Sequence, residues 1–279
     1  MSSYLRPTTL QGALAALAAG PRTVLAGGTD HYPARAVHEP DEDIVDITAL
    51  PDLRAITCTR GVWRIPALAT WSDLLRAPLP PLFDGLKQAA RQVGGCQIQN
   101  TGTLVGNVCN ASPAADGIPP LLALDAAVEL RSLVGTRAQP LAEILLGPRR
   151  TARRPDELVT ALLMPDRDAT SRFLKLGGRR YLVISISMVA TTLVQDDGGR
   201  VTQAAIAVGA CGPVATRLAG LEAALLGHVP HPDLVQPEHL APLSPIDDMR
   251  APAAYRLQAT LELLRRALTP AGQSAALAA

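Results

Sequence analysis

The sequence contains very little lysine and asparagine. Only two of its 26 basic residues are lysine, Lys87 and Lys175, and all the others are arginine. A chain that uses arginine for general positive charge keeps a lysine where a compact ammonium is required, because guanidinium is a broad planar fork. The only three asparagines lie in one short stretch: Asn100, Asn107 and Asn110. Asparagine favours turns and caps, so we expect non-repetitive backbone between residues 94 and 116.

The sequence also lacks a surplus of either charge and any pairing of cysteines. Lys plus Arg number 26 and Asp plus Glu number 25, for a net charge of +1, which leaves no basic excess for a nucleic-acid footprint. Its four cysteines are widely separated: Cys58, Cys96, Cys109 and Cys211. No C-x2-C pair and no histidine at ligand spacing accompanies them, so we expect neither a metal site nor a disulfide scaffold. A reducing, cytoplasmic setting fits best.

No apolar run is long enough to cross a bilayer, which needs about 20 residues. The longest, residues 181–194, is shorter and contains Ser and Thr. The N-terminal stretch 9–20 has amphipathic helical spacing and only one basic residue, Arg6, before it, so we interpret it as a helix and not as a secretion signal.

The length of 279 residues suggests two domains, with a boundary between residues 166 and 171. Before it, the patterns predict helices at 7–19, 71–75, 81–93 and 119–124, and strands at 23–26, 44–47, 62–66, 127–132 and 158–164. After it, they predict strands at 171–176, 183–195 and 201–209, and helices at 213–226 and 252–268. The turn Asp196–Gly199 predicts an antiparallel hairpin. The fold class is therefore α+β.

Two glycine-containing segments are candidate ligand sites, although the dinucleotide-binding G-x-G-x-x-G and the P-loop are absent. In the first, Leu25–Asp30 (LAGGTD), consecutive glycines let backbone N–H groups converge on an anion. The alternative is a strand-to-helix turn capped by Thr29 or Asp30. The second, residues 102–116, mixes small residues with polar ones, as a flat polar ligand requires; the alternative is a polar loop. Two such segments favour a long, two-ended ligand.

Together these segments identify a family. LAGGTD at 25–30, GTLVGNVCNASPAADGIPPLLALDA at 102–126, FLKLGGRR at 173–180 and PIDDMRAPAAYR at 245–256 resemble, in order and spacing, the FAD-binding medium subunit of the xanthine dehydrogenase and carbon monoxide dehydrogenase family of molybdenum hydroxylases. The resemblance implies a FAD-binding domain of two α+β subdomains at 1–167, split near residue 55. A small domain with a three-stranded antiparallel sheet and helices follows at 168–279, with 270–279 as a candidate disordered tail.

The resemblance also implies a set of FAD-binding residues. The first turn would hold the diphosphate and adenosine through Val24, Leu25, Ala26, Gly27, Gly28, Thr29, Asp30 and His31. The second segment would wrap the flavin and diphosphate through Thr103, Leu104, Val105, Gly106 and Asn107, with Asn110 and Asp116 beyond. Val93 and Val159 would flank the cofactor, and Lys175 would lie beside the flavin and tune it. No side chain acts as a nucleophile and no metal is expected on this chain.

Two features depart from the family pattern. Val105 stands where many members have a glycine, so we expect either an extended backbone there or a slightly displaced FAD. His31 follows the aspartate where aliphatic residues are common. No inserted cysteine cluster for an additional Fe–S centre is present.

The resemblance implies an electron-transfer role. A molybdopterin-containing large subunit would hydroxylate the substrate, a small subunit would carry two [2Fe–2S] clusters, and this chain would pass the electrons through FAD to NAD+ or another acceptor. The alternatives are a stand-alone FAD-dependent oxidoreductase and a cofactor-free interaction subunit. The substrate of the complex is not encoded in this chain.

Overall fold

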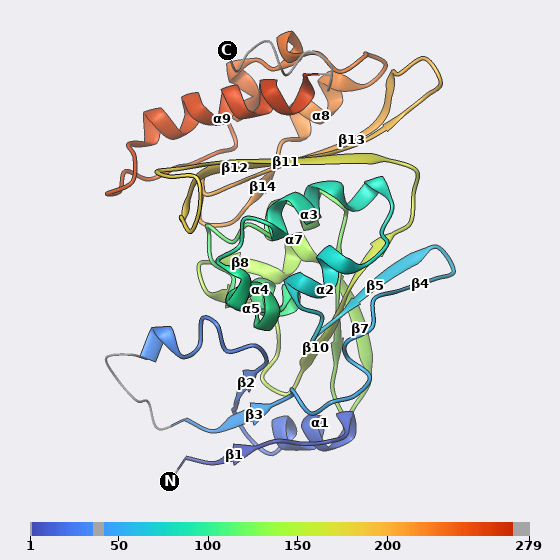
Figure 1. Ribbon diagram of the computed structural model, residues 1–279, viewed down its shortest axis with the longest axis vertical. Coiled ribbons are helices and arrows are strands. Elements are labelled where there is room, and N and C mark those ends of the chain that lie inside the picture. Colours follow the sequence, from blue (N-terminus) through green and yellow to red (C-terminus); the bar gives the residue numbers. More distant parts are fainter. Residues whose placement is uncertain (1, 36–41, 270–279) are drawn as a thin grey trace. The chain divides into compact units, whose positions relative to one another are not determined.

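The computed structural model describes residues 2–35 and 42–269. Two compact units make up the chain (Figure 1). The first contains residues 1–77, 93–111 and 126–166, and the second contains 78–92, 112–125 and 167–279. The candidate tail 270–279 lies outside the described residues, and the linear division at residue 167 stays a prediction.

The first unit opens with a small parallel sheet and a helix. The sheet has the order β1 (Tyr4–Leu5), β3 (Ile44–Asp46), β2 (Thr23–Leu25). Helix α1 (Leu10–Ala18) begins after Thr9, whose side chain accepts a hydrogen bond from the backbone N–H of Gly12. Its buried residues are Ala13, Leu14 and Leu17, which follow the helical spacing predicted from the sequence.

A five-stranded antiparallel sheet forms the rest of the first unit's framework. Its order is β4 (Thr57–Thr59), β5 (Val62–Pro66), β10 (Leu158–Pro165), β6 (Ala127–Arg131), β7 (Thr136–Pro140). Strand β10 is central because its residues 158–162 are buried on both faces, as a near-continuous apolar run requires. The first unit also contains α2 (Trp71–Arg76), α4 (Cys96–Thr101), α5 (Leu104–Asn110), α7 (Leu141–Ile144), the 3₁₀ turn η1 (Pro33–Arg35) and the hairpin of β8 (Leu145–Gly147) and β9 (Arg150–Thr151).

The second unit is an antiparallel sheet covered by helices on both faces (Figure 1). The sheet has the order β11 (Thr170–Gly177), β12 (Ser185–Gln195), β13 (Val201–Gly209), β14 (Thr216–Arg217). Helices α3 (Asp84–Ala90) and α6 (Ile118–Ala123) contact one face, and α8 (Ala219–Leu225) and α9 (Ala253–Leu268) contact the sheet in a separate core. The 3₁₀ turns are η2 (Pro81–Phe83), η3 (Pro232–Leu234) and η4 (Pro237–Leu240).

Successive residues of β12 belong to two different cores, which explains why helices cover both faces of the sheet. Met188 and Ala190 pack with Phe173 in the core beside α3 and α6, whereas Val189 and Leu193 pack in the core beside α8 and α9. Because successive strand residues point to opposite faces, this strand, which is buried from Ser185 to Leu193, has to be enclosed by helices on each side.

The α+β class and the C-terminal antiparallel sheet with helices are confirmed. The expected helix at 213–226 is wrong in its first part, because Thr216 and Arg217 pair with Val208 and Ala207 and add a fourth short strand to the three expected. The expectation of non-repetitive backbone at 94–116 is also wrong in part, because that stretch contains α4 and α5. None of the helices in the described ranges has the length and apolar character needed to span a membrane.

Candidate cofactor-binding site

A cavity of about 490 Å³ lies within the first unit. Its walls come from the turn after β2, from the start and end of α5, from the β8–β9 hairpin and from the beginning of β10. The volume falls within the range of ~300–1,000 Å³ that is usual for small-molecule and cofactor sites.

The first wall of the cavity is the turn at Gly27, whose backbone packs against the backbone of Thr101 and Gly102. A Cβ at this position would lie 2.1 Å from the carbonyl oxygen of Thr101 and 3.0 Å from the Cα of Gly102. No other residue fits, so the glycine is required by close approach. Gly28 has a positive φ of 67°, and a Cβ there would lie 2.8 Å from the ring of Tyr32. Gly27 therefore lets the first motif pack against the beginning of the second, whereas Gly28 allows the turn beside Tyr32.

The polar side chains of this turn do not cap a helix. Thr29 and Asp30 both line the cavity, and their side chains form no hydrogen bond within the described part of the chain. The capping alternative is thus not what the structure shows, and both side chains keep their hydrogen-bonding capacity for a ligand.

The second wall is helix α5. Thr103 caps it by accepting a hydrogen bond from the backbone N–H of Gly106 at 2.9 Å. Val105 lies inside the helix, so the expectation of an extended backbone there is wrong: the α-helical φ suits valine, and no positive φ is needed.

Asn107 has an unsatisfied hydrogen-bond acceptor. It lines the cavity, and its Oδ1 is buried without a hydrogen-bond partner in the described residues. A buried acceptor left unpaired costs about 1–3 kcal/mol. A ligand that donates a hydrogen bond to this atom removes that cost.

Most of the residues expected from the sequence meet at this one cavity. The lining residues among them are Val24, Leu25, Ala26, Gly27, Gly28, Thr29, Asp30, His31, Val93, Thr103, Val105, Gly106, Asn107, Asn110 and Val159. Leu104 is buried but does not line it. Asp116 and Lys175 belong to the second unit.

Several lining residues were missed by sequence reasoning. They are aromatic, aliphatic and basic: Trp71, Ile98, Arg22, Arg149 and Arg153. For the last two, the run RRTARR at 149–154 was the available signal. A charge run is usually a solvated surface, and only the fold shows that two of its members face a cavity.

Asp116 and Lys175 form a buried ion pair. Lys175 Nζ donates to Asp116 Oδ2 at 2.6 Å, and Ser185 Oγ donates to Asp116 Oδ1 at 2.5 Å. The Lys175 side chain is only 4% exposed, so it does not point into solvent. Burial raises the pKa of the Asp116 carboxyl, and the ammonium of Lys175 and the Ser185 hydroxyl oppose that rise. The sequence-based role of Lys175 beside a flavin stays a prediction.

We expect Lys175→Met to destabilise the protein in a pH-dependent way. Without the ammonium, the pKa of Asp116 rises further. Below the pKa of the unfolded state, about 3.9, the carboxyl is protonated in both states and does not lower the free energy of unfolding. As the pH rises from there through the higher pKa of the folded state, the free energy of unfolding decreases. The free energy of unfolding of the variant is therefore expected to fall below that of the wild type by about 3–5 kcal/mol at neutral pH, and by less near pH 4.

Denaturant unfolding at both pH values measures this difference. Lys175→Met combined with Asp116→Asn is the matched control, because it removes the unpaired buried carboxylate, and we expect it to recover much of the lost stability at neutral pH. Equal losses at the two pH values would contradict the buried pair.

Comparison with known proteins agrees with this architecture. Residues 1–167 match the family model of the FAD binding domain in molybdopterin dehydrogenase, and residues 172–271 match that of the CO dehydrogenase flavoprotein C-terminal domain. The nicotinate dehydrogenase FAD-subunit of Eubacterium barkeri is 33% identical over 74% of this chain and 72% of its own. A putative xanthine dehydrogenase FAD-binding subunit of Escherichia coli is 32% identical over 77% of this chain and 76% of its own.

Solved structures show the same fold. A chain of the carbon monoxide dehydrogenase from Hydrogenophaga pseudoflava superposes with a TM-score of 0.89 at 26% identity, covering 96% of each chain. The first family model alone spans more than half of the present chain, and its FAD-binding assignment matches a cavity with a glycine cradle and an unpartnered buried amide. The chain therefore belongs to the family of FAD-binding domains of molybdopterin dehydrogenases, and it is a FAD-binding flavoprotein subunit of a molybdenum hydroxylase.

Proposed function

We propose that this chain accepts electrons from [2Fe–2S] clusters of a partner subunit and passes them, through bound FAD, to NAD+ or another acceptor. The observation that carries the proposal is the Gly27–Thr101 approach, which brings both glycine-containing motifs to a single cavity. When bound, FAD supplies the redox chemistry, and the protein supplies binding, orientation and electrostatics.

The residues present fit such a cofactor. The turn at Gly27 and Gly28 lines the cavity, and we propose that its backbone N–H groups bind a phosphate group there. Asn107 offers an acceptor for a hydrogen-bond donor on the cofactor, and Thr29 offers a hydroxyl. Val105 and Val159 supply apolar surface for a planar ring. No catalytic side chain is needed.

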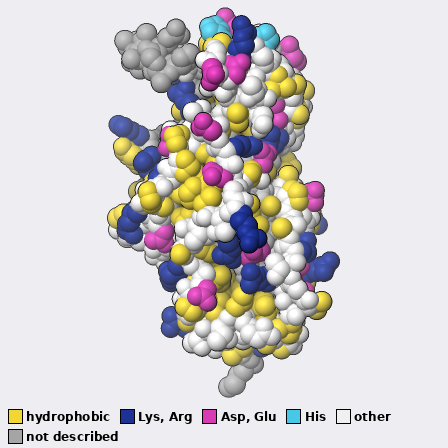
Figure 2. Space-filling view, turned by 90° about the vertical axis from the view of Figure 1, so that its right-hand side faces the viewer, with side chains coloured by type: hydrophobic (Ala, Val, Ile, Leu, Met, Phe, Trp, Pro, Cys, Tyr) yellow, Lys and Arg dark blue, Asp and Glu magenta, His cyan; other side chains and the backbone are white. Residues whose placement is uncertain are grey.

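A role as one subunit among several is supported by the relatives. Similar proteins include the nicotine 6-hydroxylase medium subunit of Paenarthrobacter nicotinovorans and the carbon monoxide dehydrogenase medium chain of Hydrogenophaga pseudoflava. The loop between β11 and β12 exposes Tyr181, Leu182 and Ile184, each more than half accessible. Figure 2 shows a face on which hydrophobic side chains are exposed between acidic and basic ones. We propose an Fe–S small subunit and a molybdopterin large subunit as the partners, in the cytoplasm.

Replacement of Gly27 tests the FAD site. We expect Gly27→Ala to lower bound flavin by more than about tenfold, because the added methyl collides with the Thr101 carbonyl and forces the two motifs apart. Flavin absorbance per mole of purified, folded protein measures this. Gly20→Ala is the control, because a Cβ at Gly20 has no atom within 4 Å and its φ is not positive. A soluble Gly27→Ala protein with full flavin content would be incompatible with the site.

Reconstitution tests the electron-transfer role. We expect flavin in this chain to be reduced by the substrate of the complex only when both partner subunits are present, and NAD+ or an artificial acceptor to reoxidise it. Rapid-mixing absorbance spectroscopy measures the reduction with each partner omitted in turn. Reduction by an organic substrate with this chain alone would favour the stand-alone oxidoreductase.

Lys175 is proposed to tune the flavin potential. We expect Lys175→Met to lower the FAD midpoint potential, because a reduced anionic flavin loses a nearby positive charge. Asp116→Asn is expected to raise it, since that carboxylate offsets the ammonium at 2.6 Å. A shift of ~30 mV corresponds to about 1.4 kcal/mol for a two-electron couple. Lys87→Met, which changes the other lysine, is the control; a midpoint unchanged in Lys175→Met at equal FAD occupancy would remove the assigned role.

A further inference from the structure

The motifs that identify the FAD site do not include its basic residues. Arg149 and Arg153 line the cavity from either side of β9. Arg149 has a positive φ of 56°, so the tight β8–β9 turn sets the direction of its backbone. Arg149 is exposed and Arg153 is half-buried.

The guanidinium of Arg149 is oriented by the end of α5. Its Nη1 donates to Asn110 Oδ1 at 3.0 Å, and its backbone N–H donates to the carbonyl of Ala111 at 2.9 Å. Its Nε and Nη2 form no hydrogen bond within the described ranges. One side of the fork is thus fixed, and the other is available to a ligand.

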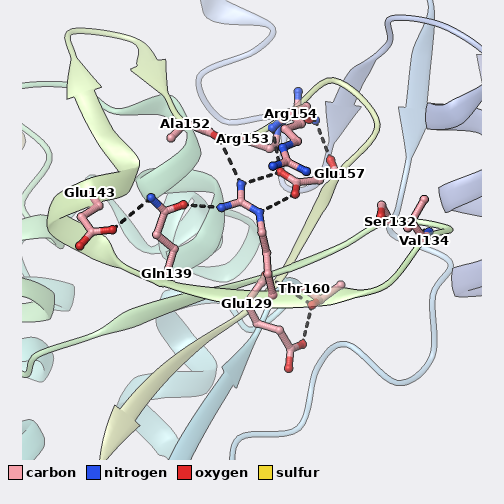
Figure 3. A network of polar contacts seen from close by, with 11 residues as sticks. Glu129, Ser132, Val134, Gln139, Glu143, Ala152, Arg153, Arg154, Glu157 and Thr160 are labelled. Atoms are coloured by element: carbon pink, nitrogen blue, oxygen red, sulfur yellow. Dashed lines mark hydrogen bonds and ion pairs between the residues drawn. The ribbon is translucent and has the colours of Figure 1, made fainter.

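Arg153 is held in place by a polar network (Figure 3). Its Nη1 donates to the carbonyl of Glu157 at 2.7 Å and to that of Arg154 at 3.1 Å. The Glu157 carboxylate is in turn bound by both the Nε and Nη2 of Arg137, at 2.6 and 2.8 Å. Arg137 of strand β7 therefore holds the loop that contains Arg153 and Glu157 in place.

No carboxylate in the described part of the chain balances the positive charge of Arg149 and Arg153. Arg22, which also lines the cavity, is paired with Asp43 at 3.5 Å. Arg149 and Arg153 form no ion pair with any described carboxylate. Two uncompensated guanidinium groups on one cavity favour an anionic ligand group.

We propose that Arg149 and Arg153 form a phosphate-recognising wall of the cavity that contacts the diphosphate of FAD. This inference rests on the proposed FAD-binding function and assigns side chains that recognise the dinucleotide. The phosphates are the only part of FAD that carries full negative charge, and guanidinium forks match phosphate oxygens in geometry and charge. The wall therefore makes the site select a phosphorylated flavin over riboflavin.

Binding of FAD and riboflavin to the flavin-free full-length chain tests the wall. Flavin fluorescence titration gives both dissociation constants for the wild type, Arg149→Gln, Arg153→Gln and the double variant. We expect each single change to weaken FAD binding by about tenfold, since a hydrogen bond to a charged group contributes that much or more, and to leave riboflavin binding within about twofold. Arg150→Gln is the matched control, because Arg150 lies between them, is exposed and does not line the cavity.

If the loss of the Arg153 contacts unfolds the loop, Arg149→Gln alone tests the proposal, because among the described residues the Arg149 side chain bonds only to Asn110. Salt adds a second readout: the preference of the wild type for FAD over riboflavin decreases with ionic strength, and the variants lose that dependence. Wild-type FAD affinity in Arg149→Gln, or equal weakening of FAD and riboflavin, overturns the inference and leaves the proposed function intact. A wild-type chain that binds neither flavin overturns both.

Discussion

The cavity depends on the approach of Gly27 to the carbonyl of Thr101, where a Cβ would stand 2.1 Å from the oxygen. This contact joins a turn that follows a parallel strand to the junction between helices α4 and α5, two segments more than 70 residues apart. It explains why consecutive glycines and a run of small residues occur in the same sequence. The cap at Thr103 and the buried oxygen of Asn107 follow directly after that contact in the sequence.

Sequence patterns predict elements well where one interaction dominates. The apolar spacing of Leu10, Leu14 and Leu17 predicts α1, and the Asp-Asp-Gly-Gly turn predicts the β12–β13 hairpin. They fail where tertiary contacts override local preference. Thr216 and Arg217 become a strand only because β13 offers an edge, and α4 forms with no buried residue of its own to mark it. Short elements of this kind carry too little periodicity to be recognised.

The residues of the candidate site also fall into those that the sequence predicts and those that it does not. Backbone requirements leave traces in composition, so Gly27, Gly28 and Asn107 could be singled out before any coordinates. Arginine leaves no such trace in a chain that uses it throughout, and whether Arg149 or its neighbour Arg150 faces the cavity depends on one tight turn. Lys175 was predicted only in part. As one of two lysines it could be singled out from the sequence, whereas its ion pair with Asp116, and the hydrogen bond from Ser185 to that carboxylate, are seen only in the structure.

Helices α3 and α6 lie in the sequence among segments of the first unit, but they complete the core of the second. During synthesis, α3 leaves the ribosome about 80 residues before β11, the strand whose Phe173 shares a core with it, and chains grow at about 5–20 residues per second. Its buried face, which includes Leu86 and Ala89, is without its native partner for several seconds. The nascent chain therefore carries unpaired apolar surface while about 80 further residues are added, a period in which binding by a chaperone is most useful.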